Sequence, residues 1–389
     1  MTDERKKLLF VCYGLGIGGI ETCFVNLLNI LPEERFQIDV LLMNPEYESK
    51  PKVKVDVHYL DSFQYVMNTT DTMHEIQEHG GILKNFGKFI AYCCFRLRVK
   101  LHMNAWVVFR KLPKHYDVAI AYSQNDYSPY YVIDKVDADK KVMWYHNGAY
   151  ESTGKKHQRD NTYYLKFDKV IAVSSDCKAM LRSNFEFADG QLVILRNICD
   201  ASDVIKKSNA FVPESFSTSG FHITTVGRMT KEKGADLAVE TCREICKKKP
   251  DVRWHWVGDG NQQESIKAKV REYGLQNNFI FEGNQTNPYP YIKCAGIYIQ
   301  PSYYEAYSTT VTEAKILCKP IVTTDVGGMR DQLKNGETGF IVPIDKKALV
   351  NVIVELMEND DLRLQLTNRL SGEHFDTRSS LQEYINTVF

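Results

Sequence analysis

The sequence predicts an α/β protein made of two doubly wound domains that face each other across a cleft. Short apolar segments typical of buried strands alternate with helical segments along most of the 389 residues. Such alternation indicates parallel sheets with right-handed crossovers. A polar, serine-rich stretch at 199–220 separates two series of these segments and indicates a linker. The length also favours two domains over one.

The first domain is predicted at 1–198 and the second at 221–371, followed by a terminal helix within 372–389. In the first domain a helix is expected at 20–31, and the strands are expected at 8–13, 36–43, 117–122, 141–145, 169–174 and 192–196. In the second domain helices are expected at 235–248 and 309–318, and the strands at 222–227, 252–258, 278–283, 296–300 and 320–324.

Composition excludes several classes of function. Lys+Arg and Asp+Glu both number 49, and this balance argues against general nucleic-acid affinity. No apolar run approaches the roughly 20 residues that span a bilayer, and the N-terminus does not read as a signal peptide. Ten cysteines occur without a C-x-x-C pair, which predicts reduced thiols and no zinc site. We therefore expect a cytoplasmic protein.

One segment departs from this balance. Between residues 80 and 116 there are eight basic residues and no acidic ones: Lys84, Lys88, Arg96, Arg98, Lys100, Arg110, Lys111 and Lys114. Aromatic residues are interleaved with these charges. Residues 84–114 could lie on an anionic membrane surface. Alternatively they form a helix pair with aromatic side chains in the core and charges in solvent.

A glycine-rich loop follows the first predicted strand. Gly14, Gly16 and Gly19 match G-x-G-x-x-G before a helix, where backbone N–H groups and the helix dipole favour a phosphate. A dinucleotide-binding domain would also place an acid at the end of the second strand. Asp39 has about the right spacing, but the predicted strand continues beyond it. This motif alone decides little.

The second domain carries two further groups of polar residues. Arg228 and Lys233 flank a predicted strand-to-helix turn, where both could bind a diphosphate. Glu305 precedes a predicted helix, and Glu313 lies one turn inside it. The residues at its start are Ser308, Thr309 and Thr310, whose N–H groups could face a phosphate. Taken singly, these charges could also be capping or surface residues.

Taken together, the motifs resemble family 4 of the glycosyltransferases, a retaining family of glycosyltransferase group 1 with the GT-B fold. The resemblance rests on segments that occur in the family's order along nearly the whole chain: GIGGIE, VSSDCKAML, LRNICD, VGRMTKEKG, WVGDG, PSYYEAYSTTVTEA and TTDVGGMRDQL with GETGFIV. It implies two Rossmann-like domains, with the final helix crossing back to the first domain.

The resemblance also implies roles for residues of the second domain. Arg228 and Lys233 correspond to the basic pair on the donor diphosphate, with the helix start at 308–310 beside them. Glu305 corresponds to the first Glu of an E-x7-E motif, close to the donor sugar. Glu313 corresponds to the second, on the ribose. The sequence departs from the family at Ala306 and Ser308, where glycines are frequent.

In the first domain, the resemblance implies that Gly18 and Gly19 close over the donor phosphates. His146, which follows the predicted strand at 141–145, corresponds to a histidine that contacts the donor sugar. We therefore predict His146 and Glu305 as the catalytic residues. The Asp137–Asp139 pair spells D-x-D, a metal motif of another glycosyltransferase fold, but it lies in a predicted polar turn. No metal or other cofactor is expected.

The implied function is retaining transfer of a sugar from a nucleotide diphosphate sugar, for which a UDP-sugar is expected. The implied acceptor is a hydroxyl of a saccharide or lipid-linked saccharide in surface polysaccharide or glycolipid synthesis. The protein would then act in the cytoplasm or at the cytoplasmic face of the membrane. Two other functions were weighed, an NAD(P)-dependent oxidoreductase and a non-catalytic carbohydrate-binding relative.

Overall fold

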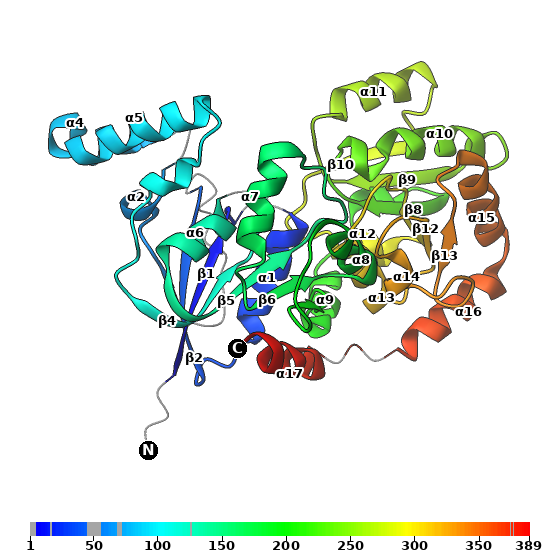
Figure 1. Ribbon diagram of the computed structural model, residues 1–389. Helices are drawn as coiled ribbons and strands as arrows, with labels where there is room; N and C mark the ends of the chain where they lie inside the picture. The colour runs from blue at the N-terminus through cyan, green and yellow to red at the C-terminus, as the bar shows by residue number, and fades with distance from the viewer. Residues whose placement is uncertain are drawn as a thin grey trace. The chain divides into compact units, whose positions relative to one another are not determined.

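The computed structural model describes residues 5–15, 18–44, 56–67, 72–124, 127–373, 375 and 377–389. The chain divides into two compact units (Figure 1). The first unit comprises Met1–Val173, Lys178–Leu195 and Leu381–Phe389, and the second comprises Ser174–Cys177 and Arg196–Ser380. Each unit contains one fully parallel sheet, which confirms the predicted fold class of two Rossmann-like domains.

The sheet of the first unit has seven strands in the order β3-β2-β1-β4-β5-β6-β7. They are β1 (Lys6–Cys12), β2 (Phe36–Leu42), β3 (Val57–Tyr59), β4 (His115–Ala121), β5 (Asp137–Tyr145), β6 (Lys169–Ala172) and β7 (Leu192–Ile194). The helices are α1 (Gly19–Ile30), α2 (Ser62–Tyr65), α3 (Thr72–Glu78), α4 (Gly81–Lys84), α5 (Phe86–Lys100), η2 (Ala105–Val108), α6 (Ser128–Lys135), α7 (Gly154–Tyr164) and α8 (Ser175–Asn184).

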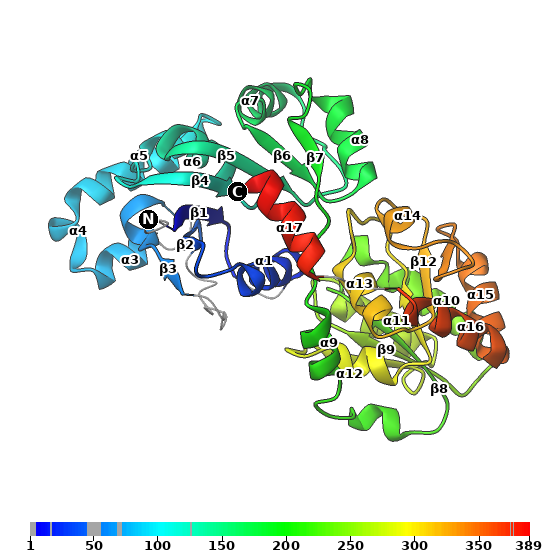
Figure 2. The same cartoon turned by 90° about the horizontal axis from the view of Figure 1, so that it is seen from below.

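The end of the chain completes the core of the first unit. The last helix, α17 (Thr377–Val388), precedes Phe389, whose ring centre lies 5.2 Å from that of Phe36. Tyr384 packs on Trp144 at 5.4 Å, and the Lys6 ammonium donates to the Phe389 carbonyl at 2.8 Å. Figure 2 shows this helix beside the first unit. The chain therefore returns to the first unit after it has built the second.

The sheet of the second unit has the order β10-β9-β8-β11-β12-β13. Its strands are β8 (Phe221–Val226), β9 (Val252–Val257), β10 (Phe279–Gly283), β11 (Ile297–Gln300), β12 (Ile321–Thr324) and β13 (Phe340–Val342). Its helices are α9 (Ala201–Ser208), η3 (Glu214–Ser217), η4 (Lys231–Lys233), α10 (Ala235–Cys246), α11 (Gln263–Glu272), α12 (Tyr289–Cys294), α13 (Thr309–Ile316), α14 (Met329–Gln332), α15 (Lys346–Glu358) and α16 (Asp360–Ser371).

The stretch 199–220, predicted as a linker, is more ordered than its composition indicates. It contains α9 and η3 and groups with the second unit. The side chain of Val204 is buried in the core of that unit, and the Phe216 ring stacks on His255 at 3.9 Å. Apolar residues spaced between the polar ones fix the segment to the sheet. Pattern reading missed them because serines and lysines dominate the stretch.

The basic segment 84–114 is divided between interior and surface. Lys88 is buried and donates to the Val66 carbonyl at 2.7 Å, and Lys114 pairs with Asp39 at 2.8 Å. Lys88 is therefore an interior group, and Lys114 is half-buried and paired, so the expectation that all eight charges lie in solvent or on a membrane surface is wrong for these two. Burial lowers the pKa of Lys88 to about 8. The aromatic residues are also divided, because Phe86 is exposed while Phe95, Trp106 and Phe109 lie in the core.

The D-x-D motif lies in a different element from the one expected. The Asp137–Asp139 motif opens strand β5 instead of lying in a turn, and both carboxylates contact His115, at 3.1 and 3.3 Å.

Within the described parts of the chain, no helix combines the length and apolar character needed to cross a bilayer.

The turn between η4 and α10 gives a test of the second unit. Gly234 has φ +70°, and a Cβ there would lie 2.0 Å from the Pro301 carbonyl oxygen. We expect Gly234→Ala to cost about 3 kcal/mol or more, because left-handed strain adds to a backbone clash. Gly274 has φ +67° but no atom within 4 Å of its added Cβ, so Gly274→Ala should cost only about 1 kcal/mol.

Urea unfolding followed by tryptophan fluorescence would measure both variants, since Trp254 and Trp256 lie in the core of the second unit. Equal costs for the two substitutions would contradict the close approach at Gly234.

Candidate functional site

The candidate site of the second unit lies where its strand order reverses. Strands β8 and β11 are neighbours at the centre of the sheet, although they are far apart in sequence. The loops that follow them are therefore close, and in open parallel sheets ligands bind at this point. The turn 227–234 follows β8, and the segment 301–308 follows β11. The Tyr303 N–H donates to the Glu232 carbonyl at 2.8 Å and joins the two loops.

Lys233 and Glu305 meet at this junction. The Lys233 ammonium lies 2.7 Å from Glu305 Oε1. Two buried side chains donate to the same oxygen, Ser302 at 2.8 Å and Gln300 at 3.0 Å. Among the described residues no donor reaches Glu305 Oε2. A buried carboxylate is thus held rigidly through one oxygen, while the other remains available to a ligand.

Arg228 lies on the same turn but takes no part in this cluster. Its side chain is 65% exposed, and among the described residues it forms an ion pair only with Glu232, at 3.6 Å. An exposed pair of this kind contributes little to stability. The guanidinium can therefore turn toward an incoming anion at small cost.

The first turn of α13 is shaped by hydrogen bonds of its side chains. Ser308 caps the helix, with its hydroxyl 3.4 Å from the Val311 N–H. Gln332 from α14 bonds both the N–H and the carbonyl of Ser308, at 2.9 and 2.7 Å. The Thr310 hydroxyl donates to Gln300 at 3.1 Å. Thr309 and Thr310 would therefore meet a phosphate through backbone groups near the helix start.

Glu313 has a different environment from Glu305, although it lies on the adjoining helix. Its carboxyl is buried and accepts one hydrogen bond, from the Tyr289 hydroxyl at 3.2 Å. Burial raises the pKa of Glu313 to about 8, although the Tyr289 bond and Lys207 oppose the rise. Without a ligand, the Glu313 carboxyl is therefore protonated at neutral pH. A ribose hydroxyl that took the place of the Tyr289 hydroxyl would meet a carboxyl group that can donate or accept a hydrogen bond.

The predicted residues of the first unit lie at the carboxyl ends of its strands. Gly18 caps α1 directly after the β1 loop, with its carbonyl accepting from the Thr22 hydroxyl at 2.8 Å, and Gly19 is the first residue of the helix. Gly16 of the same motif lies outside the described residues. His146 follows β5 and is buried. Burial lowers the pKa of His146 to about 3, so its ring is neutral.

The structure thus brings Lys233 and Glu305 into contact and places Arg228 and Ser308 on the loops beside them. It puts Glu313 into a separate apolar environment, and Gly18, Gly19 and His146 on the other unit. Sequence reasoning missed Gln300, Ser302 and Gln332, which orient the site. Ser302 and Gln332 lay inside motifs given above and Gln300 lay outside them, but an isolated serine or glutamine gives no pattern that could have found its role.

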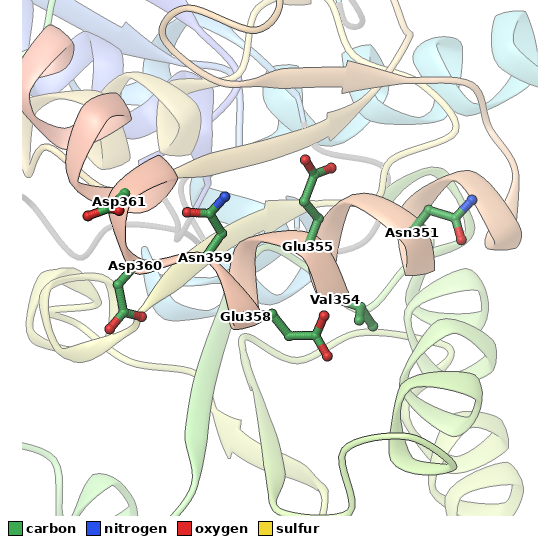
Figure 3. Close-up of a pocket in the computed structure, with 7 residues that line it drawn as sticks. All are labelled: Asn351, Val354, Glu355, Glu358, Asn359, Asp360 and Asp361. Carbon is green, nitrogen blue, oxygen red and sulfur yellow. The ribbon is translucent and has the colours of Figure 1, made fainter.

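A separate hollow lies far along the sequence from these residues, between the end of α15 and the start of α16. Its lining is mainly acidic and consists of Asn351, Val354, Glu355, Glu358, Asn359, Asp360 and Asp361. Figure 3 shows that the carboxylates point in different directions, with Glu355 on one side of α15 and Glu358 on the other. Lys249 pairs with Glu358 at 2.8 Å. These acids are solvated surface groups and do not form a metal site.

Known structures show which fold the chain has. HepE of Anabaena, in a crystal structure with UDP, matches with a TM-score of 0.69 and 17% identity over 98% of this chain and 99% of its own. The fold is the two-domain GT-B type. Residues 206–370 match the family model described as glycosyl transferases group 1. This match lies within the second unit, and it confirms the group 1 resemblance for that part of the chain.

Curated relatives are also glycosyltransferases. The poly(ribitol-phosphate) α-N-acetylglucosaminyltransferase of Staphylococcus aureus is 25% identical over 62% of this chain and 48% of its own length. The N-acetylgalactosamine-N,N'-diacetylbacillosaminyl-diphospho-undecaprenol 4-α-N-acetylgalactosaminyltransferase of Campylobacter jejuni is 25% identical over 94% of this chain and 93% of its own. The chain spans 64% and 48% of the first two curated relatives that it matches.

The protonation of Glu313 gives a pH-dependence. Its folded pKa of about 8 lies above the ordinary glutamate pKa of 4.5, so between these pH values the folded state holds a proton that the unfolded state loses. This contribution to stability is complete below pH 4.5 and is lost as the pH rises to about 8. Since each pKa unit corresponds to about 1.4 kcal/mol, the loss amounts to several kcal/mol.

Glu313→Gln keeps the shape of the protonated side chain and cannot ionise. We expect the variant to unfold at a higher urea concentration than wild type at pH 9 and at a similar one at pH 4.5. The control Glu337→Gln changes an exposed glutamate and should leave the pH profile unchanged. A Glu313→Gln profile parallel to that of wild type would contradict the raised pKa.

Proposed function

We propose that this glycosyltransferase moves a sugar from a nucleoside diphosphate sugar, a UDP-sugar, to a hydroxyl of a saccharide or lipid-linked saccharide. The observation that carries the proposal is the Lys233–Glu305 contact at the strand reversal, with Glu305 Oε2 left for a ligand. A cation and an oriented carboxylate at one point suit a diphosphate and an adjoining sugar hydroxyl. The structures of HepE with UDP support a uridine nucleotide.

The bond that breaks joins the anomeric carbon to the diphosphate, and negative charge develops on the leaving group. Lys233 and Arg228 lie on the turn where they can stabilise that charge, together with the start of α13. The proposed reaction uses no metal ion, because these groups stabilise the charge of the leaving group. The new bond joins the anomeric carbon to the acceptor oxygen, and the acceptor proton passes to the leaving phosphate. Attack from the face that the phosphate leaves retains the configuration.

A nicotinamide-dependent reaction fits the residues less well. A dinucleotide site would use Asp39 on the ribose, but this side chain is 1% exposed. Asp39 accepts from the Tyr116 hydroxyl at 2.7 Å and the Lys114 ammonium at 2.8 Å. Its hydrogen bonds therefore hold the interior of the first unit together.

The lipid-linked acceptor and a membrane surface are a second part of the proposal. The exposed large hydrophobic residues of the chain concentrate around α4 and α5. We define the apolar stripe as Leu83, Phe86, Ile90, Leu97 and Leu101, which are 94%, 58%, 47%, 56% and 57% exposed. Phe86, Ile90 and Leu97 recur at helical spacing on one face of α5, and Leu101 directly follows the helix. Both views place α4 and α5 at the edge of the first unit (Figures 1 and 2).

Basic side chains flank this stripe. Lys84, Arg96 and Lys100 are exposed beside it. An apolar face bordered by cations binds the surface of an anionic bilayer. The name of the Campylobacter relative, which includes an undecaprenol-linked diphosphate, supports an acceptor held in a membrane. The protein would then work at the cytoplasmic face.

Nucleotide release tests the reaction. Wild type would be incubated with UDP-, GDP- and ADP-sugars in EDTA, and we expect slow release of UDP from one donor. Lys233→Ala and Glu305→Ala should lower kcat/KM by about 10- to 100-fold, because each removes a charge-assisted contact. The control Glu337→Ala removes an exposed glutamate of the same unit and should be neutral.

Three outcomes would contradict the proposed reaction or part of it. A thermal shift with NAD and none with any nucleotide sugar would favour the oxidoreductase. Sugar binding without turnover would favour the non-catalytic relative. Release that needs a divalent ion would refute the metal-free arrangement.

Vesicle sedimentation tests the membrane part. Wild type should sediment with anionic vesicles, and Phe86→Asp with Leu97→Asp should abolish this. Replacing Lys84, Arg96 and Lys100 by Gln should weaken binding about 100-fold, at about 1 kcal/mol per charge. Leu364→Asp changes a residue of α16 with the same exposure as Phe86, 58%, and should have no effect. Wild type that stays in the supernatant would refute the membrane surface.

A further inference from the structure

A second polar pair lies in the first unit, at the carboxyl ends of two neighbouring strands. Gln124 follows β4 by three residues, and His146 follows β5 directly. Their side chains are 6% and 9% exposed. The His146 backbone N–H donates to Gln124 Oε1 at 3.1 Å. Gln124, which lies in none of the sequence motifs, is therefore hydrogen-bonded to His146, a predicted site residue.

This backbone bond fixes which way the Gln124 amide points. An N–H group can only donate, so it must face the amide oxygen and not the amide nitrogen. The amide nitrogen, Nε2, is consequently turned away from the His146 backbone. Its two N–H donors then face a direction set by the strands and not by free rotation.

Three other hydrogen-bonding atoms of the pair lack a protein partner in the part of the chain that the structure describes. Within the described residues, Gln124 Nε2 and both ring nitrogens of His146 are buried without a hydrogen bond. The Tyr122 backbone lies close enough to His146 to favour its charged form, but burial dominates and lowers the pKa of the ring. A buried donor left unpaired costs about 1–3 kcal/mol. Three such atoms from two adjacent strand ends indicate a site that a polar ligand completes.

The chemistry of the pair selects the class of ligand. With a neutral ring, His146 offers one donor and one acceptor, and Gln124 Nε2 offers donors only. A hydroxyl group donates and accepts, so it satisfies both side chains. A phosphate or carboxylate lacks the proton that the ring acceptor needs, and a cation would be repelled by the amide donors. The ligand is therefore a neutral polyhydroxyl compound, such as a sugar.

We propose that Gln124 is a specificity-determining residue, whose Nε2 donates to a sugar hydroxyl that the neighbouring His146 ring also binds. The inference rests on the proposed function, because it assigns a contact to one of its two sugars. The hydroxyl belongs either to the sugar being transferred or to the acceptor. In both cases the contact favours sugars that carry a hydroxyl at one particular ring position.

The test uses Gln124→Leu, which keeps the size of the side chain and removes the amide, in the full-length protein. Donor turnover is measured first without acceptor, as nucleotide release, with the parent donor and with analogues that lack one hydroxyl each. Wild type should lose about 10- to 100-fold in kcat/KM on one analogue. Gln124→Leu should show the same loss on the parent donor and no further loss on that analogue.

If the hydroxyl belongs to the acceptor, nucleotide release without acceptor stays unchanged in Gln124→Leu. The KM for the acceptor then rises about 10- to 100-fold, and deoxy acceptors replace deoxy donors in the comparison. The inference is overturned if the variant still discriminates against every analogue as wild type does. Wild type that turns over no donor would refute the proposed function itself, and this contact with it.

Gln191→Leu is the matched control for a merely structural role. Gln191 is also buried in the first unit, but its Nε2 donates to the Leu165 and Phe167 carbonyls at 3.1 and 2.6 Å. Its loss should lower the urea midpoint without changing sugar discrimination. Gln124→Leu should unfold closer to wild type, because its Nε2 bonds no protein group. A larger loss of stability at Gln124 than at Gln191 would contradict the proposal.

Discussion

The burial of the Glu305 carboxylate is the constraint on which the second unit's site depends. A carboxylate that is 7% exposed stays charged in a protein only with partners close by, and here Lys233, Gln300 and Ser302 supply them. These partners come from the turn after β8, the end of β11 and the loop beyond it. One oxygen therefore connects three segments, and the positions of the β8 turn and the α13 start follow from it. Removal of any one partner would affect both.

The two glutamates of the E-x7-E motif show how environment separates identical side chains. Glu305 meets a cation and two neutral donors through one oxygen. Glu313 meets one phenol in an apolar surrounding, and burial raises its pKa. Glu305 therefore places a carboxylate beside the reacting end of the ligand. Glu313 offers a neutral carboxyl group to a hydroxyl. Two roles on one segment arise from burial and partners, as the general rule for paired carboxyls states.

Much of the fold could be predicted from the sequence, because buried parallel strands leave continuous apolar runs. The runs at 8–13 and 252–258 correspond to β1 and β9 within one residue or two. Strands β3 and β13 were missed. Each has only three residues and lies at a sheet edge. The residues of β3 include a histidine, and the apolar run of β13 is too short to stand out from a loop.

The candidate site was predictable to a smaller degree. Charged residues in motifs, such as Lys233 and Glu305, were found because their type and spacing carry the chemistry. Gln300 and Gln332 were not, because an isolated glutamine acquires meaning only from the groups that tertiary structure places beside it. The error over Lys114 has the same origin, since its partner Asp39 lies 75 residues away. No local window could have shown that this charge was compensated.

The chemistry is divided between the two units. In the second unit the residues expected on the diphosphate are cationic, with Arg228 and Lys233 on one turn and Lys233 in contact with Glu305. In the first unit they are neutral, since burial holds His146 uncharged and Gln124 has no ionisable group. A neutral pair adds no ionic attraction to a diphosphate, but it can distinguish a sugar that carries a hydroxyl at one position from a sugar that lacks it. If the two sets act on one substrate, affinity comes from the second unit and selectivity from the first. Sugar preference could then change through residues such as Gln124 while the ionic cluster stays as it is.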